Sequence, residues 1–528
     1  MMDTDTRQNL NRGTLIAGCL AVCLAQIGLA IPATLNGLFQ SDLHPVGSQL
    51  TWISDAFLLP TAVLELTFGV LGDLFGRKRL LVGGAFMMAI GETVAASAPG
   101  VHQLWAGQAL TGIGAAAVFP SSLAVIAAGT HNHRDRSRGI AAWAGSLSAG
   151  GAIAPVLGGI TGNYGSWRWS FIVVTIIAVI STIVSHLLVR DSSAPAGRAL
   201  DWGGQITIAV GLFALLFGVI QGQGVGWSAP QVIVAFIVAA AFLVLFILAE
   251  RRAVSPMLRL ELFRNRSFAM AAAIAVIGMF SFLGTAYAVS IRMGPIQHQS
   301  PLRTAVPFLF LNGLTPVVAP LTSRLLQGVP PRWLLTGGLA AMAGGQLWMS
   351  TLPVDNTSLG SLVVPLGLVG LGFALLVSAI TAAAVNTVPL RFAGMAAAAT
   401  SLLRDLGMTL GPAIIGAVAL GRAATSFTHH LAAAPLSPEQ KAAVLEVAKE
   451  GGPLAVGSVP PGSPPAVGGP IAQTALAHGY SIGFVVCAIA AAVAATLAGA
   501  LLRGRSTDID DPRTFVDPVA GQAEPVPT

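Results

Sequence analysis

Runs of about 20 apolar residues follow one another along almost the whole chain, and they constrain the fold more than any other feature. A helix of that length spans the hydrocarbon core of a bilayer. Backbone polar groups in lipid must be satisfied within the segment, so each run is expected to be a helix. The sequence holds fourteen such runs, at 14–37, 50–71, 80–98, 104–128, 138–161, 168–189, 202–221, 231–249, 267–291, 304–325, 332–352, 359–386, 393–420 and 479–502.

Composition agrees with an all-α integral membrane protein. Of 528 residues, 54% are hydrophobic and 9% are charged, whereas soluble proteins carry about 25% charged residues. The sequence lacks a phosphate-binding loop and a His/Cys cluster with metal-ligand spacing, so we expect no enzyme activity, no metal and no cofactor. The three cysteines lie in apolar runs and are interpreted as packing residues: Cys19, Cys23 and Cys487.

The distribution of Lys and Arg predicts the orientation. With the N-terminus inside, 21 of the 28 basic residues fall in cytoplasmic segments. Cytoplasmic loops of membrane proteins carry such an excess. The sequence therefore predicts a multi-pass protein of the cytoplasmic membrane with both termini in the cytoplasm. The net charge of +6 is attributed to these topology signals and not to a nucleic-acid partner.

A short polar hinge, Gly69–Arg79, separates the second run from the third and predicts a tight helical hairpin. Asp73 lies at the end of the second run, where the helix dipole disfavours an acid. Its partner is therefore expected elsewhere. Three cations begin the third run: Arg77, Lys78 and Arg79. A role as topology signals alone accounts for Lys78 and Arg79.

An internal repeat relates the fifth run to the thirteenth. The pattern Gly-xxx-Ala-Pro-xxx-Gly at 150–159 matches Gly-xxx-Gly-Pro-xxx-Gly at 407–416. An offset of eight in fourteen helices predicts two pseudo-symmetric six-helix halves with two helices inserted between them, a known transporter architecture. Segment 319–324 is a degraded counterpart of the 69–79 hinge. The predicted parts are an N-terminal half 1–190, an inserted pair 191–258 and a C-terminal half 259–505.

Two further segments lie outside the apolar runs. Segment 421–478 is predicted to be a long outer loop. It contains a capped helix from Ser437 to Glu450, beginning Ser-Pro-Glu-Gln, and then a flexible linker from Gly451 to Pro470. The polar tail 506–528 is expected to be disordered.

Ionisable side chains inside a membrane are costly and mark candidate functional sites. Asp55 can attract a cation or cap its helix, and Glu65 can carry a proton or make a structural hydrogen bond. Glu92 has the same two readings. Arg404 can contact substrate or bind backbone carbonyls, and its neighbour Asp405 points about 100° away on the helix. The substrate or proton candidates are thus Asp55, Glu65, Glu92, Arg404 and Asp405.

The hinge resembles the signature loop of the major facilitator superfamily through Gly69, Asp73, Gly76, Arg77, Lys78 and Arg79. Fourteen helices with a central extra pair are similar to the drug:proton antiporter branch of that family. Trp52-Ile-Ser-Asp55 resembles the subgroup that exports quaternary ammonium and other lipophilic cations. The resemblance implies that Asp55 recognises cations, and that Asp73 pairs across the halves and Arg77 pairs within the motif. It also implies half-interface helices, with Gly150, Pro155, Gly159, Gly411 and Pro412.

Two positions depart from that branch. Residues 14–41 contain no acid, where the first helix usually has an Asp, and Gln108 stands where an Arg is usual. Both of the usual residues are associated with proton coupling, so the sequence leaves the coupling ion open. Gln26 and Asn36 are the polar candidates in the first helix.

The preferred interpretation is a monomeric secondary exporter of amphipathic, cationic drugs or toxic compounds. It would work in the lipid bilayer by alternating access, with the proton gradient as the energy source. Two alternatives stay open: an exporter or flippase of a lipid or endogenous metabolite, and a non-transporting membrane sensor or scaffold.

Overall fold

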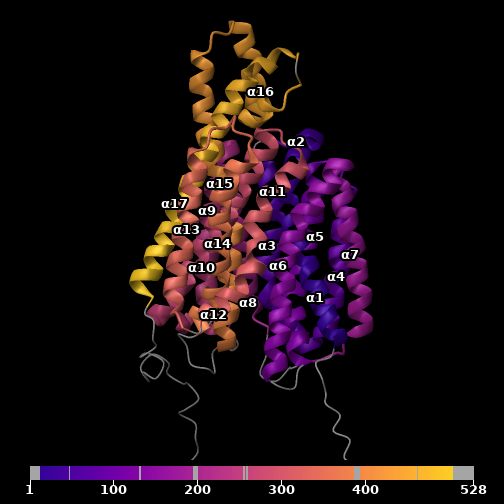
Figure 1. The fold of residues 1–528 in the computed structure, drawn as a ribbon. Helices are drawn as coiled ribbons and strands as arrows, with labels where there is room; N and C mark the ends of the chain where they lie inside the picture. The colour runs from indigo at the N-terminus through magenta and orange to yellow at the C-terminus, as the bar shows by residue number, and fades with distance from the viewer. Residues whose placement is uncertain are drawn as a thin grey trace, which may run out of the picture.

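The computed structural model describes residues 12–46, 48–129, 133–193, 200–253, 256, 260–326, 328–385, 393–460 and 462–502. Within these ranges the chain is helical almost throughout and contains no strand (Figure 1). The elements are α1 Arg12–Ala30, η1 Ile31–Thr34, α2 Asn36–Leu43, α3 Gln49–Phe75, α4 Arg77–Ala96, α5 Val101–Ala128, α6 His133–Tyr164, α7 Trp167–Leu188, α8 Trp202–Val225, α9 Pro230–Arg252, η2 Leu260–Arg264, α10 Arg266–Ile291, η3 Arg292–Ile296, α11 Pro301–Asn312, α12 Leu314–Leu325, α13 Pro331–Thr351, α14 Leu359–Val385, α15 Ala393–Ala433, α16 Pro438–Gly457, η5 Pro464–Gly468 and α17 Gly469–Leu501.

Thirteen spans among the described residues are long and apolar enough to cross a membrane. One of them, Pro301–Thr322, covers α11 and most of α12, which are separated by a break at Gly313. Helix α13 is not among the thirteen, although it packs between α14 and α17. It is less apolar, with Gln346 and two glycine pairs in its sequence. The predicted count of fourteen spans therefore stays a prediction.

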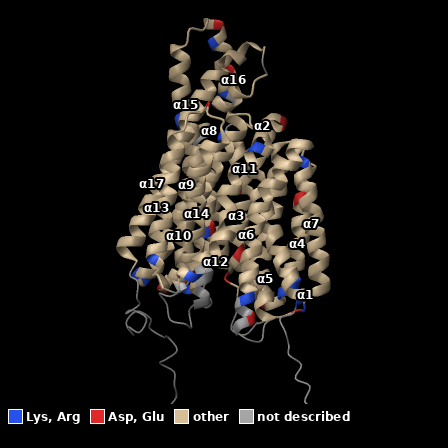
Figure 2. Cartoon of the chain, viewed as in Figure 1, with Lys and Arg blue, Asp and Glu red and all other residues tan. Residues whose placement is uncertain are grey.

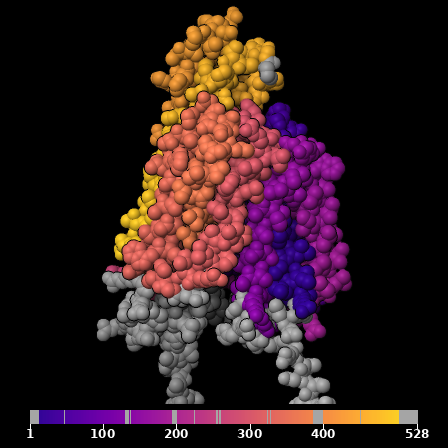
Figure 3. Space-filling model, viewed as in Figure 1, coloured from indigo at the N-terminus to yellow at the C-terminus, as the bar shows by residue number. Residues whose placement is uncertain are grey.

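The helices form two bundles. Helices α1 to α7 pack mainly against one another and form the N-terminal bundle. Helices α10 to α15 and α17 form the C-terminal bundle. Figure 3 shows the two bundles side by side, with the early part of the chain on one side and the later part on the other. The predicted boundary at 258–259 and the tail 506–528 lie outside the described residues.

Among the described residues, two helix pairs make the most extensive contacts between the bundles: α3 packs on α15, and α6 packs on α11. An offset of eight runs pairs α3 with α11 and α6 with α15. Replacing each helix by its repeat partner therefore turns the α3–α15 contact into the α11–α6 contact, and the reverse. The contacts therefore have the arrangement that a two-fold repeat requires. The inserted helices α8 and α9 pack together as a hairpin, and α8 covers the seam between α3 and α15.

The two ends of the bundles differ. We call the end that carries α2 and α16 the cap end, and the end that carries the Gly69–Arg79 hinge the basic end. Figure 2 shows the charged residues mainly near these two ends, with few in the middle of the bundles. A sparse charge distribution along the helix centres is what an apolar bilayer core requires.

Segment 421–478 differs from the predicted loop. Helix α15 continues to Ala433, and α17 begins already at Gly469. The capped start of α16 is confirmed, since Ser437 and Gln440 form a capping box. The prediction of a flexible linker from Gly451 is wrong. Gly451 and Gly452 form a kink inside α16, and the helix then continues to Gly457. A small apolar core explains this order, made of Phe427, Leu431, Val444, Val456, Ala472 and Ala475.

Candidate functional site

The two bundles are hydrogen-bonded to each other at the cap end. Asn36 of α2 donates to the Ser290 hydroxyl of α10 at 2.8 Å. Thr51 of α3 and Tyr287 of α10 share a second hydrogen bond, also 2.8 Å long. All four side chains are buried. Buried polar groups need such partners, so these bonds depend on the bundles staying together here.

Asp55 lies one turn further into α3, on the same face as Thr51. It is fully buried, and no described residue hydrogen-bonds to either of its carboxyl oxygens. Thr51, one turn away on this face, bonds to Tyr287 of the other bundle, which places Asp55 beside the contact between the bundles. Asp55 therefore lies just inside the hydrogen bonds that join the bundles at the cap end.

Glu65 of α3 and Asp405 of α15 meet between the bundles, away from the ends of both helices. The two carboxyl groups lie within hydrogen-bonding reach of each other, and the charge of Arg404 acts on both. Two neighbouring carboxylates repel each other when both are ionised, so this arrangement favours a proton on one of the acids. The Arg404 Nε has no partner among the described residues. The arrangement can hold one proton beside a fixed positive charge.

Glu92 lies apart from this group, inside the N-terminal bundle. It is fully buried on α4, and its Oε1 would lie 3.1 Å from a Cβ atom added to Gly28 of α1. Gln108 of α5 is also fully buried. Among the described residues, neither side chain has a hydrogen-bond partner. The structure thus brings together Glu65, Arg404 and Asp405 but separates Glu92 from them.

Comparisons with known proteins assign the family. Residues 18–412 match the model of the Major Facilitator Superfamily. The chain belongs to this superfamily. Its members are membrane transporters, so the protein is a multi-pass transporter and not an enzyme.

Curated relatives of this superfamily member include resistance proteins. It is 30% identical over 398 residues to the multidrug resistance protein Stp of Mycobacterium tuberculosis, covering 75% of this chain and 74% of that one. It is 26% identical over 489 residues to the tetracenomycin C resistance and export protein of Streptomyces glaucescens, covering 92% and 90%. The crystal structure of peptide transporter POT superposes with a TM-score of 0.59 at 15% identity, covering 93% and 95%. The last comparison shows the shared fold.

The superfamily hinge is held within the N-terminal bundle. Arg77 donates to the Asp73 carboxylate from Nε at 2.9 Å and from a terminal nitrogen at 2.8 Å. The Arg77 backbone NH donates to the Ser192 carbonyl at 2.9 Å. Asp191 approaches Arg79 at 3.8 Å. The segment after α7 thus contacts the hinge, which the sequence did not suggest. The expected pairing of Asp73 across the halves stays a prediction.

The remaining residues of the predicted hinge motif are Gly69, Gly76 and Lys78. Gly69 faces Pro120 of α5, and Gly76 adopts φ +110° beside Asp191. Lys78 lies in the first turn of α4. Arg324, the counterpart on α12, is exposed, and the Ser323 side chain lies outside the described residues.

The glycine patterns of α6 and α15 permit close helix packing, but only some of it joins the bundles. A Cβ on Gly159 would lie 2.8 Å from the Ala305 Cβ of α11, and one on Gly416 would lie 2.8 Å from the Thr51 hydroxyl. Gly150 packs on α1 and Gly411 on α10, each within its own bundle. The patterned prolines lie inside the two helices: Pro155 and Pro412.

Sequence reasoning missed Gln205 of α8. Its side-chain NH₂ donates to the Val63 carbonyl at 2.9 Å, and its oxygen accepts from Thr67. These bonds attach the inserted helix to α3, two residues from Glu65 on either side. The only signal was a glutamine in an apolar run, which does not reveal its partner.

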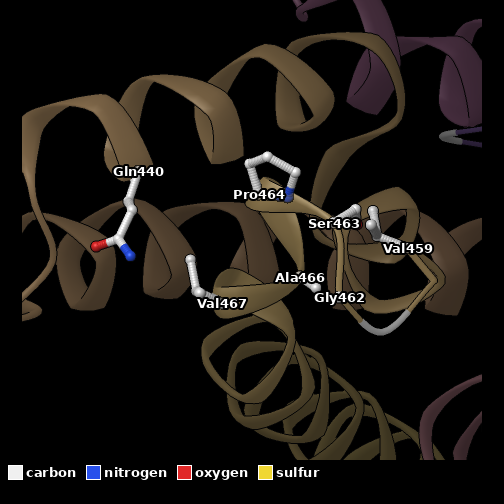
Figure 4. Close-up of a pocket in the computed structure, with 7 residues that line it drawn as sticks. All are labelled: Gln440, Val459, Gly462, Ser463, Pro464, Ala466 and Val467. Carbon is white, nitrogen blue, oxygen red and sulfur yellow. The ribbon is translucent and has the colours of Figure 1, made fainter.

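A depression of about 640 Å³ lies on the cap. Figure 4 shows the residues that line it. Gln440, Ser463 and Val467 are among its lining residues. The amide oxygen of Gln440 already accepts from the Ser437 backbone, and the Ser463 hydroxyl donates to the Pro460 carbonyl at 2.8 Å. Its polar groups thus serve the cap itself, and we assign no substrate to it.

Proposed function

We propose that this transporter exports amphipathic, cationic compounds across the cytoplasmic membrane in exchange for protons. The Glu65–Asp405 pair carries the proposal. Two acids from different bundles bind a shared proton more tightly while the bundles hold them together, because the proton relieves their repulsion. Relative movement of the bundles then changes proton affinity, which is the coupling that alternating access requires.

The orientation follows from the basic residues. Cytoplasmic segments are rich in Lys and Arg, and the hinge holds Arg77, Lys78 and Arg79. We assign the basic end to the cytoplasm and the cap to the outside. With the cap end joined by Thr51–Tyr287 and Asn36–Ser290, this state would receive substrate from the cytoplasm, the side from which an exporter loads.

Asp55 is the proposed cation-recognition group. It is buried without a hydrogen-bond partner among the described residues, beside the closed cap end. An unpaired carboxylate in such a place is costly, and a substrate cation would provide the missing charge. The relatives support export of toxic compounds, since one is a multidrug resistance protein and one a resistance and export protein.

The test is flux in proteoliposomes with an imposed pH gradient, with tetraphenylphosphonium as the probe. We expect Glu65→Gln and Asp405→Asn to lower gradient-driven uptake at least tenfold and to keep substrate-for-substrate exchange, which needs no net proton movement. Glu446→Gln is the matched control because Glu446 is exposed on the cap. Gradient-driven uptake by Glu65→Gln at the wild-type rate would remove the acid pair from the mechanism.

The same assay separates the remaining possibilities. Loss of coupling in Glu92→Gln with coupling retained in Glu65→Gln would move the proton site into the N-terminal bundle. Movement of labelled lipid in place of the probe would support a flippase. Absence of any flux in folded protein would support a sensor or scaffold.

A further inference from the structure

A second polar site lies between the bundles, at the α6–α11 contact and away from the acid pair. Gly151 of α6 is its centre. A Cβ added to Gly151 would lie 3.7 Å from Gln26 Nε2 of α1 and 3.8 Å from Asn312 Oδ1 of α11. The two amide atoms are therefore at most 7.5 Å apart, the sum of those distances. One small group can contact both.

Neither amide is committed to the protein. Within the described part of the chain, no hydrogen bond engages the Gln26 amide. Asn312 donates only to the Phe308 carbonyl of its own helix, at 3.5 Å, the limit for a hydrogen bond. Both side chains are half-buried. Such groups would gain from a ligand that supplies hydrogen bonds.

Two helices meet at the same place, at Gly313. Helix α11 ends at Asn312 and α12 begins at Leu314, midway along one membrane span. One turn further on, the Thr315 hydroxyl is buried without a partner among the described residues.

The site ends toward the cap. Two turns along α6 from Gly151, Gly159 packs against Ala305 of α11, where an added Cβ would lie 2.8 Å from the Ala305 Cβ. The two bundles are thus in contact on the cap side of the amides. A ligand held between Gln26 and Asn312 would lie on the inner side of that contact, as a cytoplasmic substrate must.

We propose that Gln26 and Asn312 form an uncharged subsite that binds the carbonyl or hydroxyl groups of the transported compound, with Gly151 as its floor. Amides donate and accept hydrogen bonds but carry no charge, so this subsite selects polar neutral groups. On the opposite contact, the Glu65–Asp405 pair would serve the proton and Asp55 the cation. The inference rests on the proposed export function and names the part of the substrate that the acids do not recognise.

The test compares two probes in proteoliposomes: tetraphenylphosphonium, a cation without hydrogen-bonding groups, and tetracenomycin C, a compound rich in carbonyl and hydroxyl groups. We expect Gln26→Leu and Asn312→Leu each to raise the KM for tetracenomycin C at least fivefold with kcat retained. The KM for tetraphenylphosphonium should change less than twofold. Gln26→Asn, which keeps an amide, should restore part of the affinity. Equal effects on both probes, or none on either, would overturn the subsite.

Filling the site gives an independent test. Gly151→Leu places a side chain between the amides, where nothing lies within 3.7 Å of the Cβ. Gly145→Leu is the control, since Gly145 lies on the same helix with nothing within 4 Å. Gly151→Leu should impair tetracenomycin C selectively and Gly145→Leu should not. Transport of neither probe by the wild-type protein would contradict the proposed export function. Transport of the probes with equal effects of Gly151→Leu on both would contradict the subsite alone.

Discussion

Thr51 on α3 and Tyr287 on α10 share a hydrogen bond of 2.8 Å that joins the N-terminal bundle to the C-terminal bundle. Alongside it, Gly37 and Gly294 bring two backbones into contact, because a Cβ on Gly37 would lie 2.9 Å from the Gly294 Cα. Polar bonds and backbone contact together hold the cap end closed. A change that prevents the approach should favour the other state of the cycle.

Gly37→Val is expected to open the cap end. The added side chain meets backbone at Gly294, which cannot rotate away as a flexible side chain could. Spin labels at Ser41 and Ser358, which are both exposed at this end on different bundles, should show a longer mean distance by double electron–electron resonance. Gly100→Val, at a loop position with nothing within 4 Å, is the control. An unchanged distance distribution in Gly37→Val would contradict the closed contact.

The hinge offers a matched pair of glycines for a stability test. Gly76 has φ +110°, and a Cβ there would lie 2.7 Å from Asp191 Oδ1. Gly76→Ala should therefore cost about 1–3 kcal/mol, the usual range for backbone strain. Gly83, in the next helix, has nothing within 4 Å, and Gly83→Ala should stabilise by about 0.5–1 kcal/mol. Unfolding temperatures in detergent measure both changes in stability. An unchanged unfolding temperature in Gly76→Ala would rule out backbone strain at this position.

The spans and their pairing were open to prediction because they depend on local patterns. Apolar length marks a membrane helix regardless of its neighbours. The glycine patterns at 150–159 and 407–416 indicated which helices correspond. The α3–α15 and α6–α11 contacts have the symmetry that this correspondence implies.

The partners within the site were not predictable in the same way. Glu65 and Asp405 are 340 positions apart, and their meeting depends on the rotation of two helices about their axes. Apolar residues on every face of a buried helix leave that rotation unmarked. The error in segment 421–478 has another cause. Its helices are rich in alanine and polar residues, so they lack apolar runs although alanine favours helix.

The capping box on α16 should contribute measurably to the order of the cap. The Ser437 hydroxyl accepts from the Gln440 backbone NH at 3.2 Å, and the Gln440 side chain accepts from the Ser437 NH at 3.0 Å. Ser437→Ala removes the first bond and should cost about 1 kcal/mol of local stability. Hydrogen exchange of the amides in 438–450 should then be about fivefold faster, since 1.4 kcal/mol corresponds to tenfold. Ser426→Ala, within α15, should leave those amides unchanged.

Acid should weaken the link between α2 and α7. Arg168 donates to Asp42 Oδ2 at 2.7 Å and Trp167 Nε1 donates to the same oxygen at 2.7 Å, and these bonds hold the pKa of Asp42 below its usual value. A group with a depressed pKa in the folded state stabilises the fold above its unfolded pKa of about 3.9 and loses that contribution as pH falls through the folded pKa. The Asp42 and Arg168 side chains are partly exposed, so their ion pair should contribute about 0–1 kcal/mol to the free energy of unfolding.

Asp42→Asn should accordingly lower the unfolding temperature in detergent at pH 7, and the difference from wild type should shrink below about pH 4. Glu446→Gln is the matched control, because Glu446 is exposed and makes no ion pair among the described residues. It should show no comparable pH-dependent difference. A difference between Asp42→Asn and wild type that stays constant from pH 7 to pH 3 would mean that the neutral contacts at this site, and not the charge of Asp42, hold α2 against α7.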